Sequence, residues 1–322
     1  KDYKPALTLI AIKDIPMNAS IQIEAVITCG EGTIPNAPQV GDLIKVVKNT
    51  NNAPTNSYSN QTVAFSHYNH LSAQLPIDSK TGKIVSGGIK EQLNQSLRNV
   101  KNILESIDVP FDDIVKVNIY TTEISQLEII KETYKTFFPD SAIARFVNYL
   151  PALTINPVVA LPMDAKVQVE VTVSHGDGTP PQLVEDRHGI VIEANNTKSV
   201  FINSLSSQTV AFSHYNNISE QLPIDANGKV ISSDINQQLS QCIENLKAIV
   251  ESVDHKLADV VKLNIYVENI DSINGFETVL KKYFSTLPAG RVVAVDTLNC
   301  KDALVKIDAI VSNAEGTPPT NK

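Results

Sequence analysis

One stretch of the chain occurs three times, whereas the other recurring segments occur only twice. The three copies cover residues 5–35, 151–180 and 288–318. In the first copy, residues 21–25 read Ile-Gln-Ile-Glu-Ala, and this alternation of apolar and polar residues predicts a half-buried strand. Each copy predicts a strand, a turn and a second strand. The second and third copies each come at the end of a set of segments that occurs twice, whereas the first copy stands at the start of the chain. The sequence therefore predicts two complete units preceded by the closing part of another unit.

The repeat has a long period. The segment QTVAFSHYN begins at Gln61 and again at Gln208, 147 residues later. The segment QLPID recurs at Gln74 and Gln221 with the same offset of 147. Solenoid repeats have only roughly 20–45 residues, so this period indicates tandem whole domains. We expect a partial unit over residues 1–36, followed by domains over residues 37–182 and 183–322.

The order of elements within each unit follows from hydrophobic periodicity. In the first complete unit, strands are predicted at residues 43–47, 62–65, 68–71 and 115–119, and a second helix at 127–137. The first helix has one apolar face, formed by Ile89, Leu93, Leu97, Val100, Leu104 and Ile107. With the closing strand pair, each unit is predicted as β-β-β-α-β-α-β-β. Amphipathic helices in this order indicate an α+β domain with both helices on one face of a sheet.

Composition narrows the classes of function. The 322 residues carry a net charge of −8, and Lys and Arg form no run that would predict a nucleic-acid-binding patch. Cys29, Cys242 and Cys300 do not have a metal-ligand spacing, and we expect reduced thiols, as in the cytoplasm. No apolar run approaches the roughly 20 residues of a membrane span. Because residue 1 is a lysine already inside a repeated unit, the sequence gives no information about a signal peptide.

The sequence resembles the RidA family, the YjgF-type reactive-intermediate deaminases. In that family a Gln lies thirteen residues before the Gln of a Ser-Gly-Gln-apolar-Pro segment, as Gln61 lies before Gln74. Residues 72–76 read Ser-Ala-Gln-Leu-Pro, with Ala in place of Gly, and residues 219–223 read Ser-Glu-Gln-Leu-Pro. The resemblance covers both complete units and, through the closing strands, the partial unit.

The resemblance implies a fold and an activity. Each unit would have the chorismate-mutase-like arrangement, a mixed six-stranded sheet with two helices on one face. Family members are usually homotrimers with ligand clefts between neighbouring sheets, and they hydrolyse 2-imino or 2-enamino acids to 2-keto acids and ammonia. We therefore expect a small-molecule ligand and self-association, without a cofactor, metal, nucleic acid or membrane. The resemblance implies clefts lined by Ser72, Gln74, Ser219 and Gln221.

The carboxylate that the resemblance implies for catalysis is present here as Glu or Asp. In the family, a Glu on the last strand positions the attacking water. Its position is taken here by Glu24, Glu170 and Asp308, which makes them candidate catalytic residues. Solvent-facing carboxylates are the alternative, because alternation along a strand places polar residues on the outer face.

The Arg that binds the substrate carboxylate in the family is displaced here. Counting back eight residues from the Leu-Pro pair, or its counterpart, leads to Leu7, Leu153 and Gly290. A Leu there would make the cleft apolar, and losing one partner of a buried charge pair costs about 2–5 kcal/mol. Arg291 comes one residue late, and one step along a strand turns a side chain to the opposite face. Arg291 is thus either a carboxylate clamp on a bulged strand or a surface or interface arginine.

Three functions are compatible with these features. We favour a RidA-like tandem protein without classical deaminase activity, which acts through ligand binding or assembly at inter-domain clefts. The alternative is a 2-iminobutanoate/2-iminopropanoate deaminase that retains one active cleft, with Arg291 as its clamp. Nuclease activity, sometimes ascribed to the family, fits poorly with a net charge of −8.

The partial unit also bears on assembly. Because three units form the ring of the family, two complete units cannot close a ring by themselves. Either residues upstream of Lys1 complete a third unit, or separate chains associate. In both cases we expect residues 1–30 to pair with another unit or another chain, since unpaired strand edges attract partners.

Overall fold

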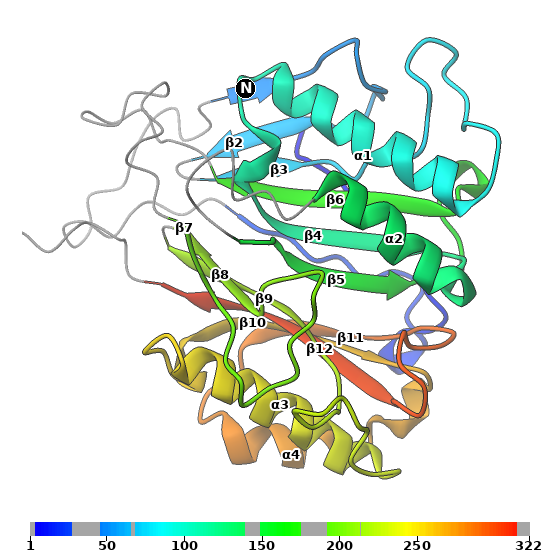
Figure 1. The fold of residues 1–322 in the computed structure, drawn as a ribbon. Helices are drawn as coiled ribbons and strands as arrows, with labels where there is room; N and C mark the ends of the chain where they lie inside the picture. Colours follow the sequence, from blue (N-terminus) through cyan, green and yellow to red (C-terminus); the bar gives the residue numbers. More distant parts are fainter. Residues whose placement is uncertain are drawn as a thin grey trace, which may run out of the picture.

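The computed structural model describes residues 4–27, 46–65, 68–138, 149–174, 192–212 and 214–313. These residues form an N-terminal segment (residues 4–27) and two α+β units, shown in Figure 1. Unit 1 contains β1 (Val46–Lys48), β2 (Thr62–Phe65), β3 (Tyr68–Leu71), α1 (Ile89–Glu105), β4 (Ile114–Thr121), α2 (Leu127–Phe137), β5 (Ala152–Pro157) and β6 (Val167–Ser174). Unit 2 contains β7 (Ile192–Asn195), β8 (Thr209–Phe212), β9 (Tyr215–Gln221), α3 (Ile235–Glu251), β10 (Val260–Val267), α4 (Phe276–Tyr283), β11 (Ala289–Ala294) and β12 (Val305–Ser312). The predicted order of elements is confirmed in both units.

Each unit has one mixed sheet. The strand order is β1-β2-β3-β6-β4-β5 in unit 1 and β7-β8-β9-β12-β10-β11 in unit 2. The pairs β4–β5 and β10–β11 are parallel, because α2 and α4 provide the crossover that parallel strands need. The other pairs are antiparallel. The fold class is therefore as predicted, and β5 and β11 are edge strands.

Some sequence predictions lie outside the described residues. The strands predicted at residues 62–65 and 68–71 are confirmed as β2 and β3. Residues 43–45 of the predicted opening strand lie outside the described residues. The same holds for Cys29 and for the expected unit boundaries at 36–37 and 182–183, so those boundaries stay predictions.

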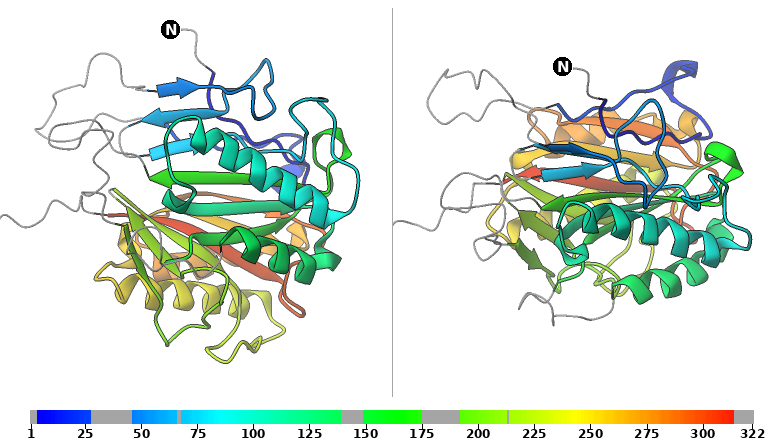
Figure 2. Two further views of the ribbon diagram at one scale, coloured as in Figure 1. Left: turned by 45° about the horizontal axis from the view of Figure 1, so that its top comes forward. Right: turned by 90° about the horizontal axis from the view of Figure 1, so that it is seen from above.

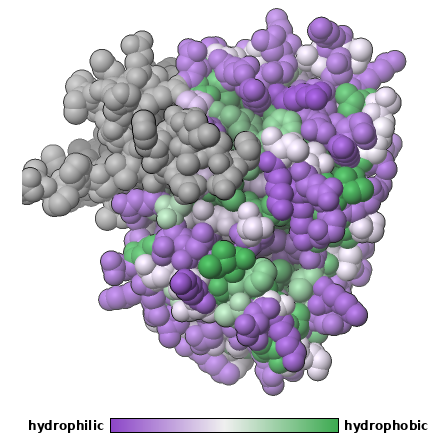
Figure 3. Space-filling view, viewed as in Figure 1, coloured by the Kyte–Doolittle hydropathy of each residue, from purple (hydrophilic) through white to green (hydrophobic). Residues whose placement is uncertain are grey.

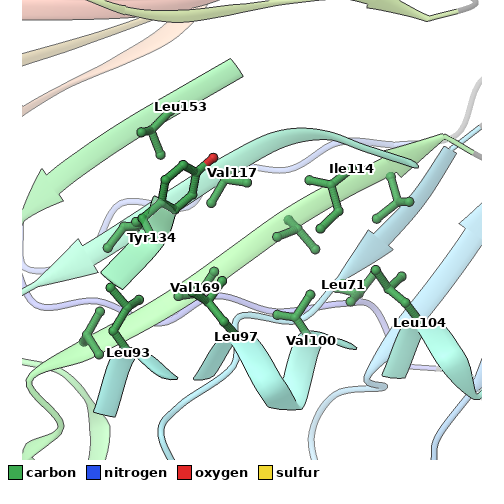
Figure 4. Packing of buried hydrophobic residues seen from close by; sticks show 14 of the residues in the cluster. Leu71, Leu93, Leu97, Val100, Leu104, Ile114, Val117, Tyr134, Leu153 and Val169 are labelled. Atoms are coloured by element: carbon green, nitrogen blue, oxygen red, sulfur yellow. The ribbon is translucent and has the colours of Figure 1, made fainter. Parts of the chain in front are cut away.

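The core of unit 1 lies between its helices and one face of its sheet. In Figure 4, Leu93, Leu97 and Val100 of α1 lie beside the sheet residues Val117 and Val169, and all five side chains are fully buried. A spacing of three or four residues places the α1 side chains on one side of the helix. In unit 2 the helix α3 contributes Leu239, Cys242, Ile243, Leu246 and Val250 in the same way. The helices thus cover one face of each sheet and leave the other face free for contacts between units.

The two sheets face each other, with their helices on the outside (Figures 1 and 2). Between them, the ring of Tyr68 on β3 meets that of Phe212 on β8 edge to face, with centroids 5.6 Å apart. The backbone amide of Tyr215 donates to the Tyr68 hydroxyl (3.1 Å). The strands β5 and β9 are also in contact. The helix-free faces therefore form the interface between the units.

The N-terminal segment runs along both units. The amide of Ala11 donates to the oxygen of Ala160 in unit 1 (3.0 Å). The amide of Lys13 donates to the oxygen of Ala294 in unit 2 (3.0 Å). The prediction that this segment pairs with another unit is therefore confirmed.

The prediction of two strands within the N-terminal segment is wrong, because only isolated bridges form there. In each unit the last closing strand lies between two others, whereas no described strand forms a ladder with residues 21–27. Ile21 and Ile23 are accordingly 77% and 85% exposed, while their counterparts Val167 and Val169 are fully buried. Apolar and polar residues alternate in the same way in all copies. The presence of partner strands therefore decides whether a copy forms a strand.

Two simple kinds of site are not found among the described residues. Hydrophilic residues predominate on the face shown in Figure 3, and hydrophobic residues form small separate patches there. Within the described ranges, no helix is both long and apolar enough to cross a membrane. In the same ranges, His, Cys, Asp and Glu do not gather in groups that could hold a metal ion. The polar side chains between the sheets are therefore the candidates for a functional site.

We predict that Leu97→Ala lowers the free energy of unfolding of unit 1 by about 2–5 kcal/mol, because it leaves a cavity in the core. Urea-induced unfolding followed by circular dichroism measures the change. The control is Arg98→Ala on the exposed side of the same helix, which should shift the unfolding midpoint only slightly. Equal effects of the two substitutions would contradict the assigned buried face.

Candidate functional site

A row of polar side chains crosses the helix-free face of unit 1. Thr154 of β5, Asn118 of β4 and Glu170 of β6 lie directly opposite one another in the sheet. Directly opposite residues point to the same face, and the Asn118 amide donates to the Glu170 carboxylate (2.8 Å). The hydroxyl of Thr8 donates to the other oxygen of this carboxylate. Glu170 thus lies where the N-terminal segment meets unit 1.

The corresponding row of unit 2 contains Arg291 of β11, Asn264 of β10 and Asp308 of β12. The Asp308 carboxylate accepts hydrogen bonds from the Asn264 amide (2.8 Å) and the Tyr266 hydroxyl (3.2 Å). Arg291 donates to the same hydroxyl (3.0 Å). Burial raises the pKa of Asp308, but nearby cations, Lys116 foremost, and the bond from Asn264 hold it below its usual value. Asp308 is therefore a buried, ionised carboxylate.

The structure corrects the expected direction of Arg291. The pairing of β10 with β11 runs without a bulge, and it places Arg291 opposite Asn264 on the helix-free face. Gly290 is instead opposite Leu263, a core residue. A Cβ at Gly290 would lie 1.9 Å from the Leu263 oxygen, so the close approach of the two strands requires glycine. Arg291 reaches the face of the acid without a bulge because strand register sets the face.

Leu153 and Gly290 do not line the cleft with side chains, contrary to prediction. Leu153 is opposite Val117 and lies in the core beneath the helices, 2% exposed (Figure 4). Leu153 therefore places no apolar side chain on the helix-free face, where the cleft is predicted. Its backbone amide does reach unit 2, where it donates to the Ser219 hydroxyl (2.9 Å). Thr154, the next residue, occupies in unit 1 the position that Arg291 has in unit 2.

The predicted cleft serines receive a backbone amide from the preceding copy. The Ser72 hydroxyl accepts from the amide of Leu7 (2.8 Å), as the Ser219 hydroxyl does from β5. Gln74 and Gln221 are buried, and their side chains donate to the backbone oxygens of Ser72 (2.7 Å) and Ser219 (3.0 Å). The glutamine side chains therefore hold the backbone of the serines, and their predicted role in a ligand cleft stays a prediction.

These contacts define three junctions between copies. In the N–1 junction, residues 5–8 lie against Ser72. In the 1–2 junction, β5 lies against Ser219. In the 2–N junction, β10 and β11 lie against residues 13–24. Each junction pairs an edge strand position of one copy with side chains of the next copy.

Glu24 is the acid that contacts Arg291 in the 2–N junction. Its Oε2 lies 3.4 Å from Nε of Arg291, and its Oε1 lies 2.5 Å from Nζ of Lys262. The side chain of Arg291 is 17% exposed and that of Glu24 is 29% exposed, so the ion pair is only partly shielded from water. The structure thus brings together two predicted site residues from opposite ends of the chain.

Sequence analysis missed two buried lysines. Lys116 donates to the Thr154 hydroxyl (2.7 Å) and to a backbone oxygen of β9 (2.8 Å), and burial lowers its pKa. Lys306 is completely buried and donates to the Glu220 carboxylate (2.8 Å). Each lysine lies two residues before a member of a polar row. Period two therefore places both on the helix-free face, which is the signal that could have identified them.

We predict that Ser219→Ala lowers the free energy of unfolding by about 1–3 kcal/mol, because the buried amide of Leu153 loses its acceptor. Differential scanning calorimetry measures the change. Ser199→Ala, at an exposed position of unit 2, is the control and should leave the transition nearly unchanged. An unchanged transition in Ser219→Ala would show that this contact does not hold the junction together.

Comparison with known proteins follows the same division into units. The profile of the Endoribonuclease L-PSP family matches residues 49–175 and, separately, residues 201–313. A RutC family protein of Pyrococcus horikoshii is 34% identical over 129 residues, which are 39% of this chain and 95% of that protein. The 2-iminobutanoate/2-iminopropanoate deaminase of Rattus norvegicus is 29% identical over 142 residues, which are 44% of this chain and 97% of that protein.

Solved structures match over the length of one unit. The YjgF gene product of E. coli is 29% identical, with a TM-score of 0.37, over 40% of this chain and 98% of its own. RidA of the Antarctic bacterium Psychrobacter is 26% identical, with a TM-score of 0.35, over 40% of this chain and 99% of its own. Because the two segments matched by the family profile make up more than half of the sequence, the chain belongs to the Endoribonuclease L-PSP family, the RidA/YjgF family, and contains two such units in tandem.

Proposed function

We propose that the protein hydrolyses small 2-imino acids without a cofactor, and that this activity is confined to the 2–N junction. The observation that carries the proposal is the position of Arg291, on the sheet face of Asp308 and 3.4 Å from the Glu24 carboxylate. Relatives named 2-iminobutanoate/2-iminopropanoate deaminase support the reaction class. The main reason to expect an inactive protein is a displaced Arg, and the register of β11, which places Arg291 on the face of Asp308, supports activity in spite of that displacement.

Arg291 supplies the binding place for the substrate carboxylate. A guanidinium offers two parallel N–H groups to a carboxylate, which neutral side chains cannot replace. In the structure Glu24 contacts this guanidinium, so a bound substrate takes the place of Glu24 there. Lys262, 2.5 Å from the other oxygen of Glu24, keeps the acid beside the substrate.

Glu24 is the base in this proposal. A water molecule adds to the carbon of the protonated imine (C=NH2+) and gives one proton to the Glu24 carboxylate, which leaves a neutral carbinolamine. The resulting carboxylic acid protonates the nitrogen of the carbinolamine. The C–N bond then breaks, the departing ammonia takes up the hydroxyl proton as the C=O bond forms, and the products are ammonium and a 2-keto acid. The reaction transfers no electrons to another molecule, so it requires neither an oxidant nor a reductant.

The other two junctions serve assembly in this proposal. Thr8 and Thr154 occupy the position of Arg291 there, and their hydroxyls contact Glu170 and Lys116. A hydroxyl does not neutralise a substrate carboxylate. Losing one partner of a buried charge pair costs about 2–5 kcal/mol, which is about 30-fold to several thousand-fold in binding. These junctions retain the role in assembly expected for a tandem member without deaminase activity.

We predict that Arg291→Ala lowers kcat/KM for freshly generated 2-iminopropanoate about 100-fold or more, because the carboxylate loses its charged partner. Release of ammonia, followed in a coupled assay, measures the rate. Arg291→Lys should retain part of the activity, since an ammonium keeps the charge but not the paired N–H groups. Arg98→Ala, on the exposed side of α1, is the control and should have full activity. A folded wild-type protein that releases no ammonia above the uncatalysed rate would refute the proposal and favour a role in assembly alone.

We predict that Glu24→Gln lowers kcat about 100-fold or more while changing KM little, because the amide cannot accept a proton from water. Initial rates over a range of substrate concentrations separate the two constants. The matched control is Glu277→Gln, a carboxylate on the exposed surface of α4. A normal kcat in Glu24→Gln would exclude Glu24 as the base and leave Arg291 as a binding residue only.

A further inference from the structure

The 1–2 junction contains a carboxylate bound by three converging donors. Glu220 on β9 accepts hydrogen bonds from the backbone amide of Ile155 on β5 (3.0 Å) and from the ammonium of Lys306 (2.8 Å). Its other oxygen accepts from the side-chain amide of Asn299 (2.5 Å). Lys306 is completely buried, whereas the side chain of Glu220 is 9% exposed. The carboxylate therefore lies among anion-binding groups at the margin of the interface.

The Glu220 carboxylate is the hydrogen-bond acceptor for two groups that need a partner. The strand β5 is an edge strand, so the amide of Ile155 needs an acceptor from outside its own sheet. The ammonium of Lys306 is a buried charge, which is stable only beside an opposite charge with suitable hydrogen bonds. One oxygen of Glu220 satisfies both groups.

The carboxylate and its lysine occur together in unit 2 and not in unit 1. Ala73 follows Ser72 in unit 1, where Glu220 follows the equivalent serine in unit 2. Gln168 lies opposite a tyrosine of β4, as Lys306 lies opposite a tyrosine of β10. The N–1 junction thus has neither the acid nor the cation. The two charges depend on each other physically, since either one alone would be a buried, uncompensated charge.

We propose that Glu220 is an internal carboxylate that fills an anion-binding site of the 1–2 junction, and that small monocarboxylates occupy this site when the side chain is shortened. The donors that remain are the Ile155 amide, the Lys306 ammonium and the Asn299 amide, and they suit the two oxygens of formate or acetate. In the native chain the site is closed to 2-imino and 2-keto acids, because Glu220 occupies the place of their carboxylate. The inference rests on the contacts of Glu220 and is independent of activity at the 2–N junction.

The test uses Glu220→Ala, which leaves Lys306 without a counter-charge. We expect the midpoint of thermal unfolding, measured by calorimetry, to fall by about 5 °C or more. Sodium formate and sodium acetate should raise it again with saturation, whereas sodium chloride of equal ionic strength and neutral formamide should not. Isothermal titration with formate should show binding to the variant and none to the wild type.

Two further variants separate a specific site from a general salt effect. Glu123→Ala is the matched control, because Glu123 also pairs with a lysine, Lys166 (2.6 Å), but at a partly exposed position. Its unfolding should respond to formate no more than to chloride. Lys306→Met added to Glu220→Ala should abolish the response to formate.

Equal effects of formate and chloride on Glu220→Ala, or a response that persists in the double variant, would overturn the proposal. If Glu220→Ala aggregates, its refolding yield in formate and in formamide is compared, and equal yields overturn the proposal too.

Discussion

The exposed backbone of an edge strand is the constraint on which the arrangement of the copies depends. An edge strand carries N–H groups that its own sheet cannot pair. The backbone amides of β5 donate hydrogen bonds to the side chains of Ser219 and Glu220 in the next unit, and the amide of Leu7 donates to Ser72 in the same way. These bonds determine how one copy meets the next and bring the helix-free faces of the sheets together. Because the contacts begin at the backbone, the remaining side chains of the junctions can differ from copy to copy.

The N–1 and 1–2 junctions share this backbone arrangement, and all three junctions differ in charge. The N–1 junction pairs a neutral hydroxyl with an acid, whereas the other two pair acids with buried or largely buried cations. The principal pairs are Thr8–Glu170, Lys306–Glu220 and Arg291–Glu24. The pair Lys306–Glu220 lies within unit 2, whereas Arg291–Glu24 joins unit 2 to the N-terminal segment. A largely buried charge without a partner is costly, so we infer that the pair Arg291–Glu24 also helps determine which copy meets which. The proposed difference in function follows from these charges. The 2–N junction is suited to a carboxylate substrate, whereas the 1–2 junction is filled by the carboxylate of the chain itself.

Much of the fold follows from local patterns. Apolar residues recur with the helical period along α1 and α3, and alternation predicts the strands β2 and β3 at their observed bounds. The same alternation predicts strands in the N-terminal segment, where only isolated bridges form, because a strand also needs strands beside it. The lysines Lys116 and Lys306 show the opposite limit. Period two places them on a face, but their burial depends on the neighbouring copy, which a local pattern does not contain.

By itself, the sequence determined the order of the elements, the tandem repeat and the residue types available along each closing strand. Counting from a motif led to Leu153 and Gly290 as cleft residues, whereas the tertiary structure places the residues that follow them on the helix-free face. The face of a strand residue depends on the register with its partner strand, which placed Arg291 on the face of Asp308. The tertiary structure also decided that Glu24 lies beside Arg291. Segments so distant in the chain meet only because the copies pack together, and sequence separation contains no information about that packing.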